Sequence, residues 1–172
     1  METKLNNEGI RPGRARALPP DLSQVMGCRA LLQLCFDAVQ QIAPERLAEA
    51  RERIPGCRTE MLITLLTYCY SVGIYDSWDI ESANRTDRTV RYICAGTRPE
   101  WQTLRRFRRH NREILRDSLV HVMKQTWAFH FETGEADYAG YDWFESELIK
   151  EFTETAMARL DLAALLDRAD AD

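Results

Sequence analysis

The sequence predicts an all-α fold: a compact multi-helix domain that contains a helix-turn-helix-like unit and carries an acidic amphipathic helix at its C-terminal end. Two observations predict it. Apolar residues recur at three- and four-residue steps along much of the chain, as one face of a helix requires. Prolines and capping residues stand where successive helices would begin, and glycines stand where two of them would end.

Length and composition indicate one folded domain. The chain has 172 residues, of which 45% are hydrophobic and 29% charged, which allows one real core and is short for two. The longest apolar stretch, residues 61–70, is interrupted by Thr64 and Thr67, and no signal peptide is apparent. We therefore expect a cytoplasmic protein without a membrane partner.

Three regions differ in composition. Residues 1–20 form a predicted flexible basic arm, because glycines and prolines alternate there with Arg11, Arg14 and Arg16. Residues 21–131 carry the helical pattern of the main domain. Residues 132–172 hold twelve acidic and three basic residues and form a predicted acidic helical extension packed on that domain.

The first half of the domain reads as three helices after a short one that Asp21 can cap. An apolar helical segment covers residues 31–42 and ends before Pro44, which opens a second helix over 44–54. The charges of that second helix are balanced in sign, so we interpret it as solvated. The third segment, from Thr59 to Gly73, is apolar nearly all round and belongs in the middle of the domain.

Two short helices follow. Ser77 has the form of an N-cap for a helix that runs to about Arg85. Asp87 can cap the next helix, which Gly96 closes. Two short helices, a turn with glycine and a basic helix stand in the order of a helix-turn-helix unit, although many helical domains share that order.

A basic helix is predicted to begin at Pro99 and to run beyond residue 116. Its inward face carries Leu104, Phe107, Asn111, Ile114, Leu115, Leu119, Val122 and Met123. The complementary outward side carries Arg105, Arg108, Arg109, Arg112 and Arg116. Residues 85–116 hold ten arginines and three acidic residues, whereas the whole chain has a net charge of −4. A merely solvated helix face is the alternative, but this concentration of one charge favours a polyanionic partner.

No enzymatic or metal site is predicted. The five cysteines are odd in number and widely spaced, with no zinc-finger spacing to a histidine, so we expect reduced and mostly buried thiols. We found no Ser-His-Asp order, phosphate loop or metal-ligand spacing that defines a catalytic site. We therefore expect no enzyme activity and no cofactor.

Residues 59–119 resemble the amino-terminal domain of InsH-type insertion-sequence transposases of the DDE class. The matching segments are MLITLLTYCYSVGIYDSWDIESA, RYICAG and RPEWQTLRRFRRH. The last segment resembles a family pattern that falls here on residues 99–108: Pro, an acidic residue, an aromatic residue or His, a small or polar residue, Thr, an aliphatic residue, two further residues, Phe and Arg. The resemblance implies a helical domain that recognises transposon ends. The nuclease domain that follows in the family has no counterpart after His130, so its catalytic acids are not carried over.

The first turn of the basic helix is the end that usually meets base edges. We therefore expect base contacts from Trp101, Gln102 and Thr103, although Trp101 and Thr103 have packing or capping as alternatives. Phosphate contacts are expected from the arginines. The predicted DNA-binding residues are Arg98, Trp101, Gln102, Thr103, Arg105, Arg106, Arg108, Arg109, Arg112 and Arg116.

The C-terminal helix is expected to carry an apolar stripe from Trp143 to Ala164. One interpretation is that it closes the core and shows its acids to water. The other is that its acidic face shields the basic helix or faces another subunit.

Two classes of function follow. The first is a module that binds double-stranded DNA and acts in transposition and DNA recombination as an accessory or regulator, without cleaving DNA itself. Its further partners would be a second copy of the chain or a separate transposase chain. The alternative is a helical protein-protein interaction or oligomerisation module that keeps the fold but does not bind DNA, its arginines engaging an acidic protein surface.

Overall fold

The computed structural model describes residues 18–132 and 141–169, and these residues form helices and connections without a strand. The all-α prediction is confirmed. In chain order the helices are α1 (Ser23–Met26), α2 (Cys28–Gln40), α3 (Pro44–Arg53), α4 (Thr59–Ser71), α5 (Ser77–Thr86), α6 (Arg88–Cys94), α7 (Trp101–His110), α8 (Arg112–Glu132) and α9 (Tyr141–Ala169).

Helix α4 lies at the centre, as its all-round apolar sequence predicted. Every residue from Leu62 to Ser71 is buried, and α2, α3, α6, α7 and α8 pack around the helix. The largest buried side chains include Tyr68 and Tyr70 of α4 and Phe107 of α7. Gly73, with φ of +88°, follows the helix in the left-handed region that favours glycine.

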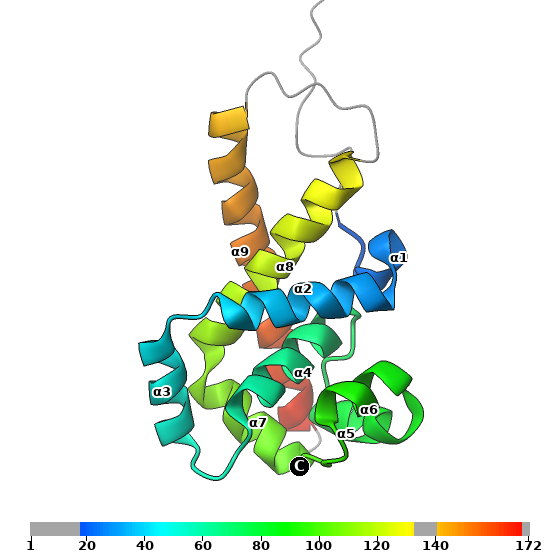
Figure 1. Cartoon of the computed structure of the whole chain (residues 1–172), viewed down its shortest axis with the longest axis vertical. Helices are drawn as coiled ribbons and strands as arrows, with labels where there is room; N and C mark the ends of the chain where they lie inside the picture. The colour runs from blue at the N-terminus through cyan, green and yellow to red at the C-terminus, as the bar shows by residue number, and fades with distance from the viewer. Residues whose placement is uncertain (1–17, 133–140, 170–172) are drawn as a thin grey trace, which may run out of the picture.

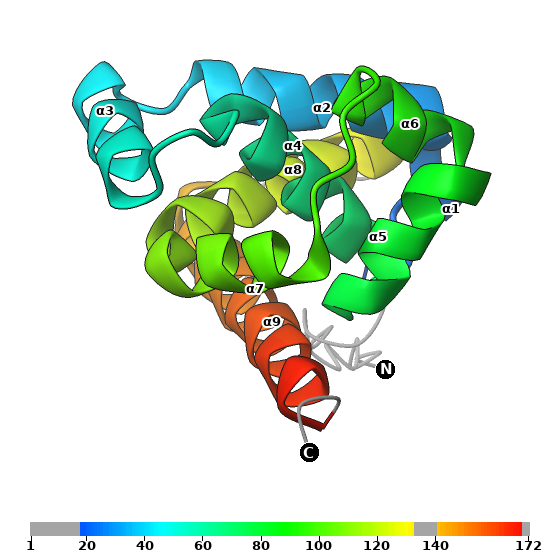
Figure 2. The same cartoon turned by 90° about the horizontal axis from the view of Figure 1, so that it is seen from below.

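Helices α8 and α9 are the two longest helices that the structure describes, and they pack against each other (Figure 1). Among the side chains of α9 that the structure describes, the buried hydrophobic ones are Phe152, Ala156, Leu160 and Ala163. Helix α7 also contacts α9, and in Figure 2 it lies between α2 at the top of the view and α9 at the bottom. The acidic helix therefore closes the core beside the basic segment.

The helix ends follow local sequence signals, with one exception. Asp87 caps α6 by accepting hydrogen bonds from the backbone N–H groups of Thr89 and Val90, at 2.7 and 2.9 Å. The N-cap of α5 is Asp76, which accepts from Trp78 and Asp79, and not Ser77 as predicted. Ser77 is buried in the first turn, where it binds another side chain described below.

The connection between α6 and α7 comprises residues 95–100. Ala95 and Gly96 turn the chain in the left-handed region, with φ of 47° and 81°. Six residues exceed the three or four of a typical helix-turn-helix turn. Helix α7 packs mainly on α5 and α4.

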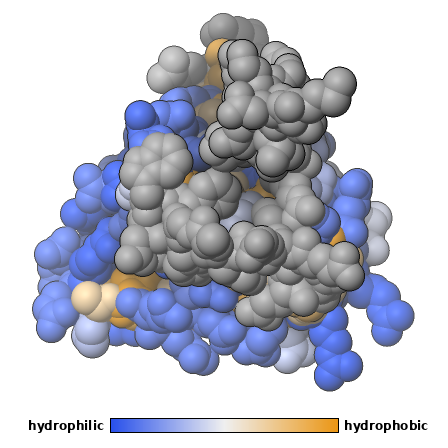
Figure 3. Space-filling view, turned by 90° about the horizontal axis from the view of Figure 1, so that it is seen from above, coloured by the Kyte–Doolittle hydropathy of each residue, from blue (hydrophilic) through white to orange (hydrophobic). Residues whose placement is uncertain are grey.

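The surface seen from above is mainly hydrophilic where its residues are coloured, with small hydrophobic areas between them (Figure 3). Exposed large hydrophobic side chains lie on several helices, among them Trp78, Tyr92, Leu162 and Leu165.

Candidate functional site

The arginine-rich segment forms two helices, so the prediction of one continuous basic helix is wrong. Helix α7 ends at His110, Asn111 takes φ −123° and ψ 30°, and α8 begins at Arg112. The Asn111 side-chain amide donates to the Phe107 carbonyl at 3.1 Å, a local bond of the kind that lets asparagine interrupt a helix. Arg105 to Arg109 and Arg112 to Arg116 therefore lie on different helices.

Arg108 is buried, so its predicted place on the outward phosphate-binding side is wrong. Only 4% of the residue is exposed. Its guanidinium donates to the Tyr70 hydroxyl at 3.0 Å and to Ser77 Oγ at 3.4 Å, and it forms an ion pair with Asp167 of α9. Burial lowers the pKa of Arg108, but Tyr70 and Asp167 outweigh it and hold the pKa above its usual value. Arg108 is thus a structural residue of the α7–α9 contact.

The Asp167 carboxylate also joins α9 to α5. One oxygen accepts from the Ser77 backbone N–H and the other from Ser77 Oγ, both at 3.1 Å. A second buried arginine, Arg159 of α9, donates to the Tyr70 carbonyl at 2.5 Å and to the Pro19 carbonyl at 3.4 Å. Burial lowers the pKa of Arg159. These contacts fix the C-terminal part of α9 on the domain.

The other predicted arginines differ in their ion pairs. Arg112 pairs with Asp161 of α9 at 2.6 Å, and Arg116 pairs with Asp117 at 2.7 Å. Four of them form no ion pair with any residue of the described ranges: Arg98, Arg105, Arg106 and Arg109. Arg98, Arg106 and Arg109 are exposed, and Arg105 is partly exposed.

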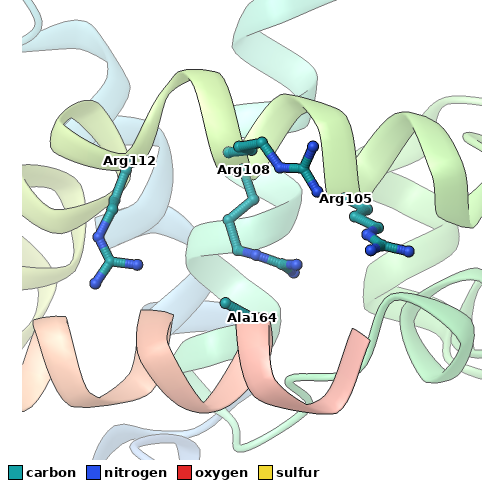
Figure 4. A pocket seen from close by; sticks show the side chains of 5 residues that line it. Arg105, Arg108, Arg112 and Ala164 are labelled. Carbon is teal, nitrogen blue, oxygen red and sulfur yellow. The ribbon is translucent and has the colours of Figure 1, made fainter. Parts of the chain in front are cut away.

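Two depressions adjoin at the junction of α7 and α8 and share Arg109 and Arg112. The first has a volume of about 180 Å³ and is lined by Arg105, Arg108, Arg109, Arg112 and Ala164. Figure 4 shows Arg108 and Arg112 extending from the α7–α8 side toward α9, which carries Ala164. The second, of about 350 Å³, reaches α3 and is lined by Arg46, Glu49, Arg53 and residues 109–114.

We call these two depressions the arginine groove, after the arginines that line it: Arg46, Arg53, Arg105, Arg108, Arg109 and Arg112. Glu49 and Glu113 are its acidic residues. Arg53 is held across the junction, because its guanidinium donates to the His110 carbonyl at 2.9 Å. Positive charge from three helices, α3, α7 and α8, therefore converges on one hollow of the surface.

The sequence interpretation missed Arg46 and Arg53 as site residues. It treated α3 as a solvated helix because its charges balance. The two arginines are seven residues apart and so share a helix face, which is a signal present in the sequence. Their contribution depends on how α3 meets the α7–α8 junction, and local sequence does not contain that information.

The first turn of α7 lies outside the groove. The Trp101 ring stacks on Trp78 of α5 with ring centroids 5.3 Å apart and planes inclined by 18°. The Trp101 backbone N–H donates to the Glu81 carboxylate at 2.8 Å, so a side chain of α5 accepts a hydrogen bond from the first residue of α7. Gln102 is exposed and Thr103 partly exposed. The base-reading role of these three residues stays a prediction.

Within residues 18–132 and 141–169, no cluster of His, Cys, Asp and Glu side chains is suited to hold a metal ion. The same ranges contain no helix with both the length and the apolar character of a membrane span. In comparisons with protein-family models, with curated proteins and with solved structures, nothing matched the chain.

Proposed function

We propose that this protein binds double-stranded DNA through the arginine groove. The observation that carries the proposal is the convergence of arginines from α3, α7 and α8 on two adjoining depressions. Arg105 and Arg109 have no ion pair among the described residues, so binding an anion there breaks no existing pair.

The chemistry of the groove suits phosphate. A guanidinium is permanently charged and presents several N–H donors in a planar fork, which matches the oxygens of a phosphate group. Arg105 and Arg109 stand one helical turn apart on α7, so their side chains lie on one face of that helix. Such contacts position a nucleic acid and supply affinity without reading its sequence.

The resemblance of residues 59–119 to InsH-type transposase amino-terminal domains is a second and independent support. It favours duplex DNA over other polyanions. It also suggests a role in transposition as an accessory or regulator that does not cleave DNA. Sequence preference, in this proposal, comes from Gln102 and its neighbours in the first turn of α7.

The test is fluorescence anisotropy with a labelled duplex of mixed sequence at low salt. The double variant Arg105→Glu plus Arg109→Glu is expected to bind at least about tenfold more weakly than the wild type, because two phosphate contacts become repulsive. The matched control is Arg88→Glu plus Arg91→Glu on α6, where two exposed arginines undergo the same change in charge outside the groove.

An equal loss in both double variants would show that total charge governs binding, and the groove would then not be the site. Failure of the wild type to bind any duplex at low salt would refute DNA binding altogether. That outcome would favour an acidic protein surface as the partner of these arginines.

A further inference from the structure

A carboxylate of α9 that does not itself line the arginine groove forms an ion pair with one of the arginines that do. Asp161 of α9 accepts from the Arg112 guanidinium at 2.6 Å. Arg112 lines both depressions, and Ala164, one turn further along α9, lines the smaller one. Helix α9 thus brings a negative group to the edge of a surface whose other arginines come from α3 and α7.

The two ion pairs that α9 forms among the described residues differ in their access to solvent. The side chains of Arg108 and Asp167 are 5% and 3% exposed, and this buried pair has no room for exchange with a ligand. In contrast, 69% of the Asp161 side chain and 33% of the Arg112 side chain are exposed. An exposed ion pair contributes little net stability, so another anion can replace one partner at small cost.

We propose that Asp161 marks a phosphate position of the arginine groove: its carboxylate holds Arg112 in the free protein and is displaced by a phosphate group of the bound duplex. The inference rests on the proposed DNA binding. It assigns Asp161 as a residue that lowers affinity and sets the ligand class.

The displacement favours a ligand with several phosphates. A single small anion can bind Arg112 only by displacing the Asp161 carboxylate, so it exchanges one ion pair for another of the same kind. A duplex backbone engages Arg105 and Arg109 at the same time, and those contacts outweigh the loss of the Asp161 pair. The partner class is therefore an extended polyphosphate and not a single phosphate.

The experiment compares Asp161→Asn with Glu154→Gln by anisotropy on one duplex at fixed low salt. Glu154 lies on the same helix seven residues earlier, is exposed and forms no ion pair among the described residues. Both substitutions remove one negative charge of α9, and Asp161→Asn alone frees Arg112. We expect Asp161→Asn to bind about threefold more tightly than Glu154→Gln, within the range that an exposed ion pair supports.

The same comparison in an Arg112→Gln background isolates the pair. The threefold difference is expected to disappear there, because Asp161 then has no Arg112 guanidinium to pair with. Equal affinities in the wild-type background, or a difference that persists without Arg112, would overturn the inference while leaving DNA binding intact. If neither variant nor the wild type binds any duplex, the proposed function fails and the inference fails with it.

Discussion

Arg108 of α7 and Asp167 of α9, 59 residues apart in the sequence, form a buried ion pair that joins the basic segment to the acidic helix. Ser77 and Tyr70 complete the hydrogen bonding around the pair, so α4, α5, α7 and α9 meet there. A charge taken from water is stabilised only when its partner and hydrogen bonds are in place.

Removing one partner of this pair is expected to be costly. Asp167→Asn leaves the Arg108 charge buried without compensation and should lower the free energy of unfolding by about 3–5 kcal/mol. Urea unfolding followed by circular dichroism measures it. The control is Asp161→Asn, which breaks an exposed pair and should cost under about 1 kcal/mol. Equal costs for the two variants would contradict the structural role of Arg108.

The salt dependence of DNA binding counts the phosphate contacts of the groove. If Arg53, Arg105, Arg109 and Arg112 each neutralise one phosphate, the plot of log affinity against log salt has a slope of about −3.6. Arg109→Gln should reduce the magnitude of that slope by about 0.9. Arg91→Gln on α6 serves as the control and should leave the slope unchanged. A slope that does not respond to Arg109→Gln places this residue outside the contact.

The sequence predicted most helices because their signals are local. Pro44 and Asp87 mark helix starts that the structure contains, and the apolar run of α4 is central because no face of it is polar. Arg108 shows the limit of such signals. Periodicity places it on the same face as Arg105 and Arg112, but it does not say that Asp167 of a distant helix covers the middle of that face. Asn111 is a second case. The helical spacing of apolar residues continues through this position, but the helix is interrupted there.

The N-cap of α5 is Asp76, whereas the sequence pattern predicted the adjacent Ser77. Asp76→Ala removes the acceptor of two backbone N–H groups and should destabilise the fold by about 1 kcal/mol. Asp76→Asn keeps a capping oxygen and should retain most of that stability. Both are measured by thermal and urea unfolding. If Asp76→Ala is neutral, Asp76 does not act as the cap.

His121 predicts a pH dependence of stability. Burial lowers the pKa of His121 below its usual 6.5, with Asp37 opposing the shift and Lys124 adding to it. Near and below pH 6.5 the unfolded chain therefore binds more protons at this position than the folded protein, and stability falls as the pH falls. We expect His121→Asn to lose less stability than the wild type between pH 7 and pH 5.5, measured by urea unfolding. An NMR titration that places the His121 midpoint above 6.5 would reverse the sign.

The cysteines provide a test of the core. Cys35, Cys69 and Cys94 are buried, Cys57 is partly buried and Cys28 is exposed, and none of the five is in a disulfide. Burial raises the pKa of Cys94 to about 11 and raises the pKa values of Cys35 and Cys69 as well. Because the thiolate is the reactive form, these three thiols combine poor access with a low thiolate fraction near neutral pH. We expect a thiol reagent at pH 8 to label Cys28 first and the three buried thiols only after unfolding. A Cys28→Ser plus Cys57→Ser variant should not be labelled before it unfolds, and labelling of this folded variant would show that a core cysteine is accessible.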